Sequence, residues 1–98
     1  MRYSEFVAQD RRLVILRILH GVAERRANQH VLRSALRSLG YDELVVTVEN
    51  DVAWLDKQGL VRLEALDGGL ILAVLTDYGD LAARGAVRVA GVAVPAVS

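Results

Sequence analysis

The sequence of 98 residues contains no cysteine, a single proline and no long uncharged hydrophobic run. The missing cysteines exclude disulfides, thiolate metal sites and a cysteine nucleophile, and they are typical of a reducing compartment. No segment approaches the roughly 18 apolar residues that a membrane-spanning helix needs. The N-terminus lacks the basic-then-apolar layout of a secretory signal. We therefore expect a cytoplasmic protein without a membrane segment.

Hydrophobic residues make up 53% of the chain and charged residues 24%. This composition supplies enough apolar surface for one core and gives no case for disorder. We expect a single domain over residues 1–85. After Gly85 only Arg88 is charged. Residues 86–98 are therefore expected to form a C-terminal tail, either extended against the body or a partner, or disordered.

The formal net charge of +0 hides a division along the chain. Residues 1–40 carry eight arginines against three acids, whereas residues 41–80 carry two basic residues against nine acids. Two interpretations follow from this asymmetry. Either the two halves pack together and neutralise each other, or the basic half forms a face for phosphates.

Apolar spacing predicts a first helix from about Ser4, as N-cap, to Gly21. Its expected core stripe consists of Ala8, Ile15, Leu16, Ile18, Leu19 and Val22. Phe6 and Leu13 lie on the opposite side of this helix. We interpret them either as the seam of a homodimer or as scattered exposed apolar residues.

Two more helices are predicted, one from the cap Asn28 to Gly40 and one from the cap Asp42 to about Gln58. Their expected inward residues are Val31, Leu32, Ala35, Leu36 and Leu39, and then Leu44, Val45, Val48, Val52 and Leu55. The β-branched run at 45–48 would also suit a strand. The caps and the long periodic continuation favour a helix.

A β-hairpin is predicted after Gly59, with strands at 60–66 and 70–75. Asp67-Gly68 is a signal for a type I′ turn, which needs positive φ at both central residues. The second strand is almost wholly apolar, so we expect both its faces to be covered. Thr76 then caps a short helix through Arg84, with Asp77 and Asp80 near its positive end.

This order of three helices followed by a two-stranded wing resembles the winged helix-turn-helix superfamily, an α+β fold, over about residues 5–84. Leu75-Thr76-Asp77-Tyr78-Gly79 is similar to the LTxxG turn after the wing in MarR-like and PadR-like proteins. More narrowly, the chain resembles a family of small uncharacterised proteins from Mu-like transposable phages and prophages. The residues that carry this second resemblance are Leu75-Thr76, Gly79, Ala83-Arg84-Gly85, Gly91-Val92 and Pro95.

The resemblance implies a transcription regulator of a phage or prophage that binds double-stranded DNA and reads base edges with its third helix. Thr47 and Asn50 are the expected base contacts, since Asn can bind adenine and the Thr methyl can touch thymine. The expected phosphate contacts are Arg25, Arg26, Arg33 and Arg37.

The acidity of the third helix favours an alternative from another class, because phosphates repel carboxylates. In this alternative the domain binds a host or phage protein, for example through a surface that mimics DNA. The interface would be an acidic and apolar patch of Glu43, Val46, Glu49 and Trp54. A lone Trp is either packed inside or exposed as an interface anchor, and the sequence leaves both open.

Enzymatic motifs are missing. The chain has no catalytic triad pattern and no nucleotide-binding fingerprint. His20 and Glu24 lie one helical turn apart, which supplies too few ligands for a metal site. We therefore expect no enzyme, no catalytic residue, no metal and no cofactor.

Overall fold

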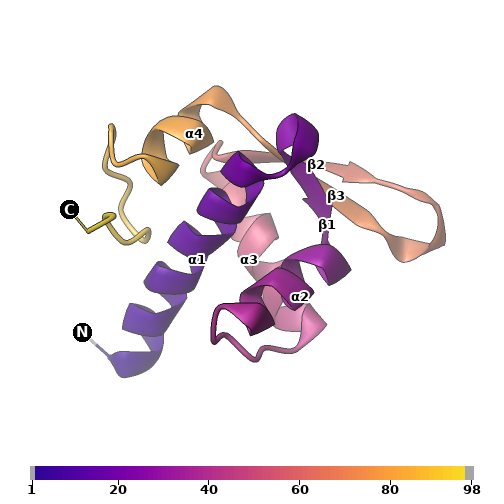
Figure 1. Cartoon of the computed structure of the whole chain (residues 1–98), viewed down its shortest axis with the longest axis horizontal. Coiled ribbons are helices and arrows are strands. Elements are labelled where there is room, and N and C mark those ends of the chain that lie inside the picture. Colours follow the sequence, from indigo (N-terminus) through magenta and orange to yellow (C-terminus); the bar gives the residue numbers. More distant parts are fainter. Residues whose placement is uncertain (1, 97–98) are drawn as a thin grey trace.

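The computed structural model describes residues 2–96, so Met1 and the last two residues of the predicted tail lie outside it. The described residues form four α-helices and one three-stranded antiparallel sheet (Figure 1), an α+β fold as expected. The elements in chain order are α1 (Tyr3–Gly21), η1 (Ala23–Arg25), β1 (Arg26–Asn28), α2 (Gln29–Ser38), α3 (Val45–Lys57), β2 (Val61–Ala65), η2 (Asp67–Gly69), β3 (Ile71–Leu75) and α4 (Asp77–Ala83). None of the helices in this part of the chain is both long and apolar enough to cross a membrane.

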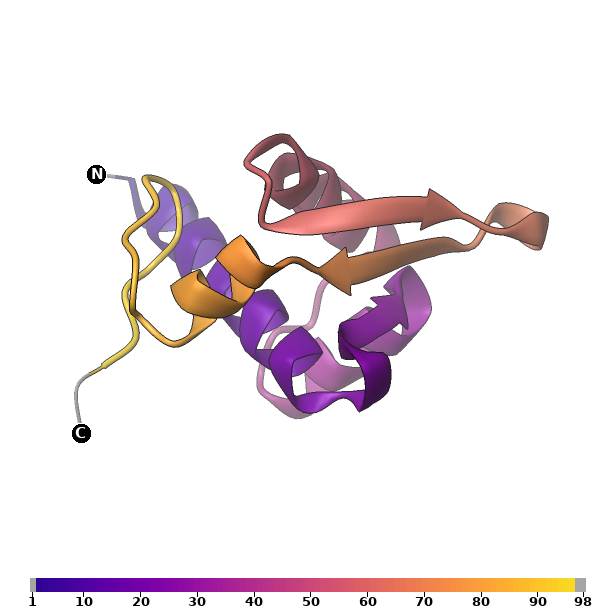
Figure 2. The ribbon, with the colours of Figure 1, turned by 90° about the horizontal axis from the view of Figure 1, so that it is seen from above.

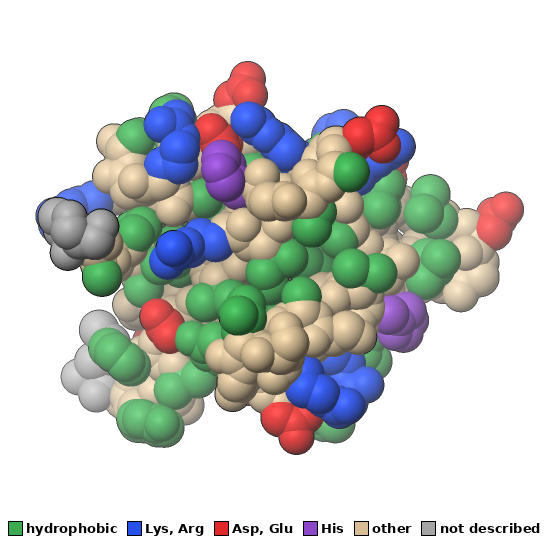
Figure 3. Space-filling model, viewed as in Figure 1, with side chains coloured by type: hydrophobic (Ala, Val, Ile, Leu, Met, Phe, Trp, Pro, Cys, Tyr) green, Lys and Arg blue, Asp and Glu red, His purple; other side chains and the backbone are tan. Residues whose placement is uncertain are grey.

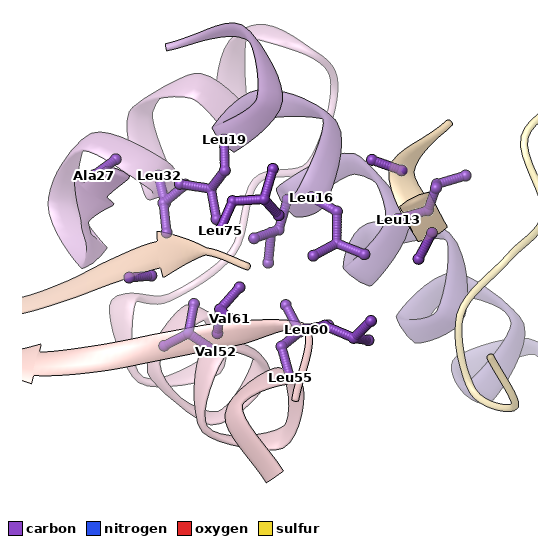
Figure 4. Packing of buried hydrophobic residues seen from close by; sticks show 14 of the residues in the cluster. Leu13, Leu16, Leu19, Ala27, Leu32, Val52, Leu55, Leu60, Val61 and Leu75 are labelled. Carbon is purple, nitrogen blue, oxygen red and sulfur yellow. The ribbon is translucent and has the colours of Figure 1, made fainter. Parts of the chain in front are cut away.

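The core lies where α1, α2 and α3 meet one face of the sheet (Figure 4). Leu16, Leu19, Leu32, Leu55 and Leu60 are completely buried there. The sheet has the order β1-β3-β2, and β1 is a strand that the sequence did not predict. Only one face of β3 is buried, by Ala73 and Leu75, while its other face is half-buried. The expectation that both faces of this strand are covered is therefore met on one face and only in part on the other.

The helix caps were predicted where they depend on local chemistry. The Asn28 side chain accepts hydrogen bonds from the backbone N–H groups of His30 and Val31, and this confirms it as the cap of α2. Thr76 caps α4 in the same way through the N–H of Gly79. By contrast, α1 begins at Tyr3 after Arg2, without a side-chain cap, so Ser4 is not its N-cap.

The start of α3 was also predicted wrongly. This helix begins at Val45 after Leu44, not after Asp42. Leu44 therefore precedes the helical stripe and is 67% exposed. At the end of α2, Leu39 has left helical geometry and is 58% exposed, and Val31 lies on the solvent side of α2. These three residues were expected to point inward.

The hairpin tip differs from the predicted type I′ turn. Positive φ falls on Gly68 and Gly69, at 75° and 79°, and not on Asp67. The three residues of η2 are enclosed by a hydrogen bond from Leu66 N to Leu70 O of 2.8 Å. The second glycine lets the chain close a longer turn than the Asp-Gly pair indicated.

Leu13 is buried, with 4% of its surface exposed, so the predicted dimer seam of Phe6 and Leu13 is wrong in its second member. The physical reason is α4, which packs on α1 from the side away from α2 and α3. Figure 4 shows Leu13 on this side of α1. Phe6 lies two turns earlier and remains 60% exposed.

The tail contacts the N-terminal half of α1. Ala93 N donates to Gln9 O at 3.1 Å, and Val92 is buried. Figure 2 shows that both chain ends lie on one side of the molecule, while the hairpin of β2 and β3 projects from the opposite side. The described part of the tail thus lies against the body, but it is not an extended arm, because Val92 N donates to Val89 O and closes a turn.

Candidate nucleic-acid interface

The outer face of α3 carries exposed side chains at a regular helical spacing. These residues are Val46, Asn50, Ala53 and Lys57. Thr47, the other predicted base contact, is half-buried beside them. The face therefore offers one amide and one ammonium group to solvent, with small or apolar residues between them.

The two glutamates that made DNA binding by α3 doubtful bind partners within the protein. Glu43 precedes α3, and its carboxylate lies 3.6 Å from a guanidinium nitrogen of Arg11. Glu49 accepts a hydrogen bond of 3.1 Å from the amide of Gln29. Both glutamates are half-buried. The exposed strip from Val46 to Lys57 contains no glutamate.

A buried ion pair fixes α3 against α1. Arg11 donates two hydrogen bonds to the carboxylate of Asp51, one of them 3.0 Å long from Nη2 to Oδ1. Both residues are buried, and the bond to Asp51 is the main cause of a raised pKa of Arg11. This pair was not predicted from the sequence. A signal was present, because Asp51 falls on the buried stripe of α3 between Val48 and Val52.

Gln29 connects α3 to the hairpin and was also missed. Its buried amide group donates to Glu49 and to the backbone carbonyl of Gly69, and it accepts from the N–H of Ile71. The first residue of α2 therefore holds the hairpin tip in a defined position relative to α3. Only the folded chain brings these partners together, so nothing local in the sequence indicated this role.

The four predicted phosphate contacts form two groups in space. Arg33 donates to the backbone carbonyl of Glu43 at 2.8 Å, and Arg37 lies 3.3 Å from Asp42, so both border the connection between α2 and α3. Arg26 pairs with Glu24 next to the sheet, and Arg25 lies 3.9 Å from Asp80 of α4.

A fifth candidate cation, Arg62, lies on β2 and was not singled out from the sequence. It pairs with Glu64 and is largely exposed. Arg62 and Arg26 are both in register with Val74, so the two arginines flank this residue on the outer face of the sheet.

Trp54 is packed against the body and does not form an exposed anchor. The guanidinium of Arg12 lies 4.2 Å from the centre of its ring, and the ring also contacts Gly91 of the tail. Arg12 additionally donates to Gly91 O at 2.9 Å. The predicted alternative interface is therefore not one exposed patch, since Val46, at 52%, is its only exposed member and the other three residues are half-buried.

A second charged cluster joins α1 to α4. His20 donates from Nδ1 to Asp80 at 2.5 Å, and Arg84 donates to the other oxygen of the same carboxylate at 3.1 Å. The bond from His20 is the main reason why the pKa of Asp80 is lowered. His20 thus faces Asp80 and not Glu24, the residue with which a metal pair had been considered.

Comparison with known proteins gives two relatives. The chain is 37% identical over 92 residues to the uncharacterised protein gp26 of Escherichia phage Mu, which covers 94% of each chain. It is 36% identical over 77 residues to an uncharacterised protein of Haemophilus influenzae strain Rd, covering 79% of this chain and 74% of that protein. No family model and no solved structure matches the chain. The predicted resemblance to small proteins of Mu-like phages is thereby confirmed, and the chain belongs to the family of the phage Mu protein gp26.

Proposed function

We propose that this protein is a winged helix-turn-helix protein that binds double-stranded DNA as a phage transcription regulator. In this proposal α3 is the recognition helix and the β2–β3 hairpin is the wing. The order of three helices followed by a hairpin supports the assignment. The hairpin also projects from the body, as a wing must in order to reach a neighbouring phosphate.

The observation that carries the proposal is the composition of the outer face of α3. Asn50 and Lys57 are exposed on it, while Glu43 and Glu49 bind Arg11 and Gln29. Asn50 can make a bidentate pair with adenine, and the methyl group of Thr47 can touch thymine. Lys57 can approach a phosphate. The repulsion expected from an acidic helix is reduced, because the carboxylates do not lie on this strip.

Two of the phosphate contacts in the proposal come from arginines whose present carboxylate partners are easily exchanged. Arg37 and Asp42 form an exposed pair, as do Arg26 and Glu24. Such exposed pairs contribute only about 0–1 kcal/mol. A phosphate can therefore replace the carboxylate at little cost. Arg33 and Arg25 complete the proposed set.

A titration with random-sequence duplex DNA at several salt concentrations tests the proposal. We expect affinity to fall steeply with salt, and Arg37→Gln to reduce the slope of log K against log salt by about one. Arg88→Gln is the matched control, because Arg88 is an exposed arginine of the tail. Absence of binding at low salt contradicts DNA binding.

A protein-binding module remains the second candidate function because of the apolar residues around the start of α3. Leu44 and Val46 are 67% and 52% exposed, close in sequence to Glu43 and Glu49. A host or phage protein with a complementary apolar surface would cover them. The DNA titration separates the candidates, since this one predicts no salt-dependent DNA affinity.

We also propose a homodimer, now without Leu13. Tyr3 and Phe6 are 82% and 60% exposed on the first turns of α1 and offer an apolar contact to a second copy. Sedimentation equilibrium tests this, with Phe6→Ser expected to weaken association. A wild-type monomer at high concentration would reject the dimer.

A further inference from the structure

A cavity of about 590 Å³ opens between the second half of α1 and the connection from α2 to α3. Its apolar lining comes from Val14, Ile18 and Val22 on one side and Leu39 on the other. In Figure 3, hydrophobic side chains gather in the middle of this face, with charged groups around them. None of the exposed residues on the outer face of α3 lines the cavity, although Arg33 and Arg37 border the same connection between α2 and α3.

The size and lining of the cavity suit a small molecule. Such sites usually measure about 300–1,000 Å³ and combine apolar walls with a few polar groups that orient the ligand. Here Leu39 is 58% exposed although it is a large apolar residue, and Val14, Ile18 and Val22 are half-buried. A bound apolar group would remove these side chains from water.

The polar groups of the lining select the charge of the ligand. Tyr41 already donates its hydroxyl to Asp10, a bond that raises the pKa of Tyr41 and keeps it neutral. Arg17 is exposed at the cavity, and no carboxylate within residues 2–96 lies within 4.0 Å of its guanidinium. An arginine fork binds a carboxylate through two parallel hydrogen bonds.

We propose that this cavity is a binding site for a small carboxylate with an apolar tail. The tail packs on Ile18, Val22 and Leu39, and the carboxylate binds Arg17. The occupant is an anion because the cavity supplies one unpaired cation and no unpaired acid. It is amphiphilic because the remaining lining is apolar, apart from the neutral Tyr41.

Octanoate is a suitable probe, added to ¹⁵N-labelled protein and followed by two-dimensional NMR. We expect saturable shifts of the amide signals of residues 14–22 and 39–41. Arg17→Gln should weaken binding about tenfold, and Leu39→Ser should also weaken it. Both side chains are exposed, so both variants should fold. Arg88→Gln, which removes an exposed arginine from the tail, should bind octanoate like the wild type.

Three results would overturn the proposal. One is the absence of saturable shifts at tens of millimolar octanoate. Another is equal affinity for octanoate and the uncharged 1-octanol, which would remove the role of Arg17. The third is a change of the same signals with protein concentration in the absence of octanoate, which would assign the cavity to a second copy of the chain. None of these results depends on whether the protein binds DNA.

Discussion

At the scale of single residues, the surroundings of Gly79 explain why the LTxxG segment ends with a glycine. A Cβ atom at this position would lie 1.9 Å from the backbone oxygen of Leu60 and 2.7 Å from a side-chain carbon of Leu75. Thr76, the second residue of the same segment, donates its hydroxyl to Gly59 O at 2.7 Å. The motif therefore docks α4 closely on the residues that lead into β2.

Gly79→Ala should destabilise the protein by roughly 3 kcal/mol, because overpacking against backbone cannot be relieved by a rotamer change. Urea unfolding measures this loss. Gly21→Ala is the matched control, since no atom lies within 4 Å of a Cβ there and the residue ends a helix. The control should be neutral or slightly stabilising. Equal stability of the two variants would contradict the close approach of α4.

Asp80 should make stability depend on acid pH. Its pKa is lowered from the ordinary value of 3.8, first by the hydrogen bond from His20 and then by Arg84 and Arg25. A carboxylate with a lowered folded pKa stabilises the fold above its unfolded pKa. This contribution is lost as pH falls through the folded value, when the carboxylate is protonated in both states.

The measurement compares wild type with Asp80→Asn by urea unfolding between pH 7 and pH 2.5. We expect the wild type to be more stable at pH 7 and the difference to shrink below about pH 4. Asp77→Asn is the control from the same helix turn, since Asp77 is exposed. A difference that stays constant down to pH 2.5 would show that the Asp80 charge is not responsible.

At the scale of elements, the pair of Arg11 and Asp51 sets the position of α3 on α1. Removing one partner leaves a buried charge, so Arg11→Met or Asp51→Leu alone should cost about 3–5 kcal/mol. The double variant should recover most of this loss, because two apolar side chains replace two charges. Urea unfolding of all four proteins tests the coupling. Additive losses in the double variant would contradict it.

Elements were predictable where their signals are local, and they were missed where distant segments decide. Asn28 and Thr76 identified two helix starts through their own hydrogen bonds. Leu13 was misplaced, because α4 follows some sixty residues later and covers the second side of α1. The strand β1 has only three residues and no periodicity to detect. Its existence depends on pairing with β3.

The candidate site, too, was predictable where its signals are local and was missed where distant contacts decide. Helical spacing correctly predicted that Asn50 faces solvent, because the buried stripe of α3 leaves the other side free. The state of the acids was not predictable. Glu49 binds Gln29, and Glu43 approaches Arg11, and both contacts join residues far apart in sequence.

At the scale of the whole molecule, the charge division along the chain corresponds to internal pairing. Arg11 binds Asp51, and Arg25 lies beside Asp80, so the basic half contributes cations to the acidic half. Arg37 of the basic half also pairs with Asp42 of the acidic half, at the surface. The interpretation that the halves neutralise each other thus accounts for several arginines. Those in exposed pairs remain able to exchange partners.

The C-terminal tail packs on the folded body, and this contact gives a prediction for the chain as a whole. Val92 is buried, and Gly91 contacts the ring of Trp54 with φ of 91°. A chain ending at Gly85 should lose about 2 kcal/mol of unfolding free energy, because these apolar contacts are removed. It should also show a red-shifted Trp54 emission, since the ring becomes exposed. Arg88→Gln, an exposed change within the tail, should alter neither quantity. If the shortened chain keeps both the stability and the emission of the wild type, residues 86–96 are not part of the folded domain.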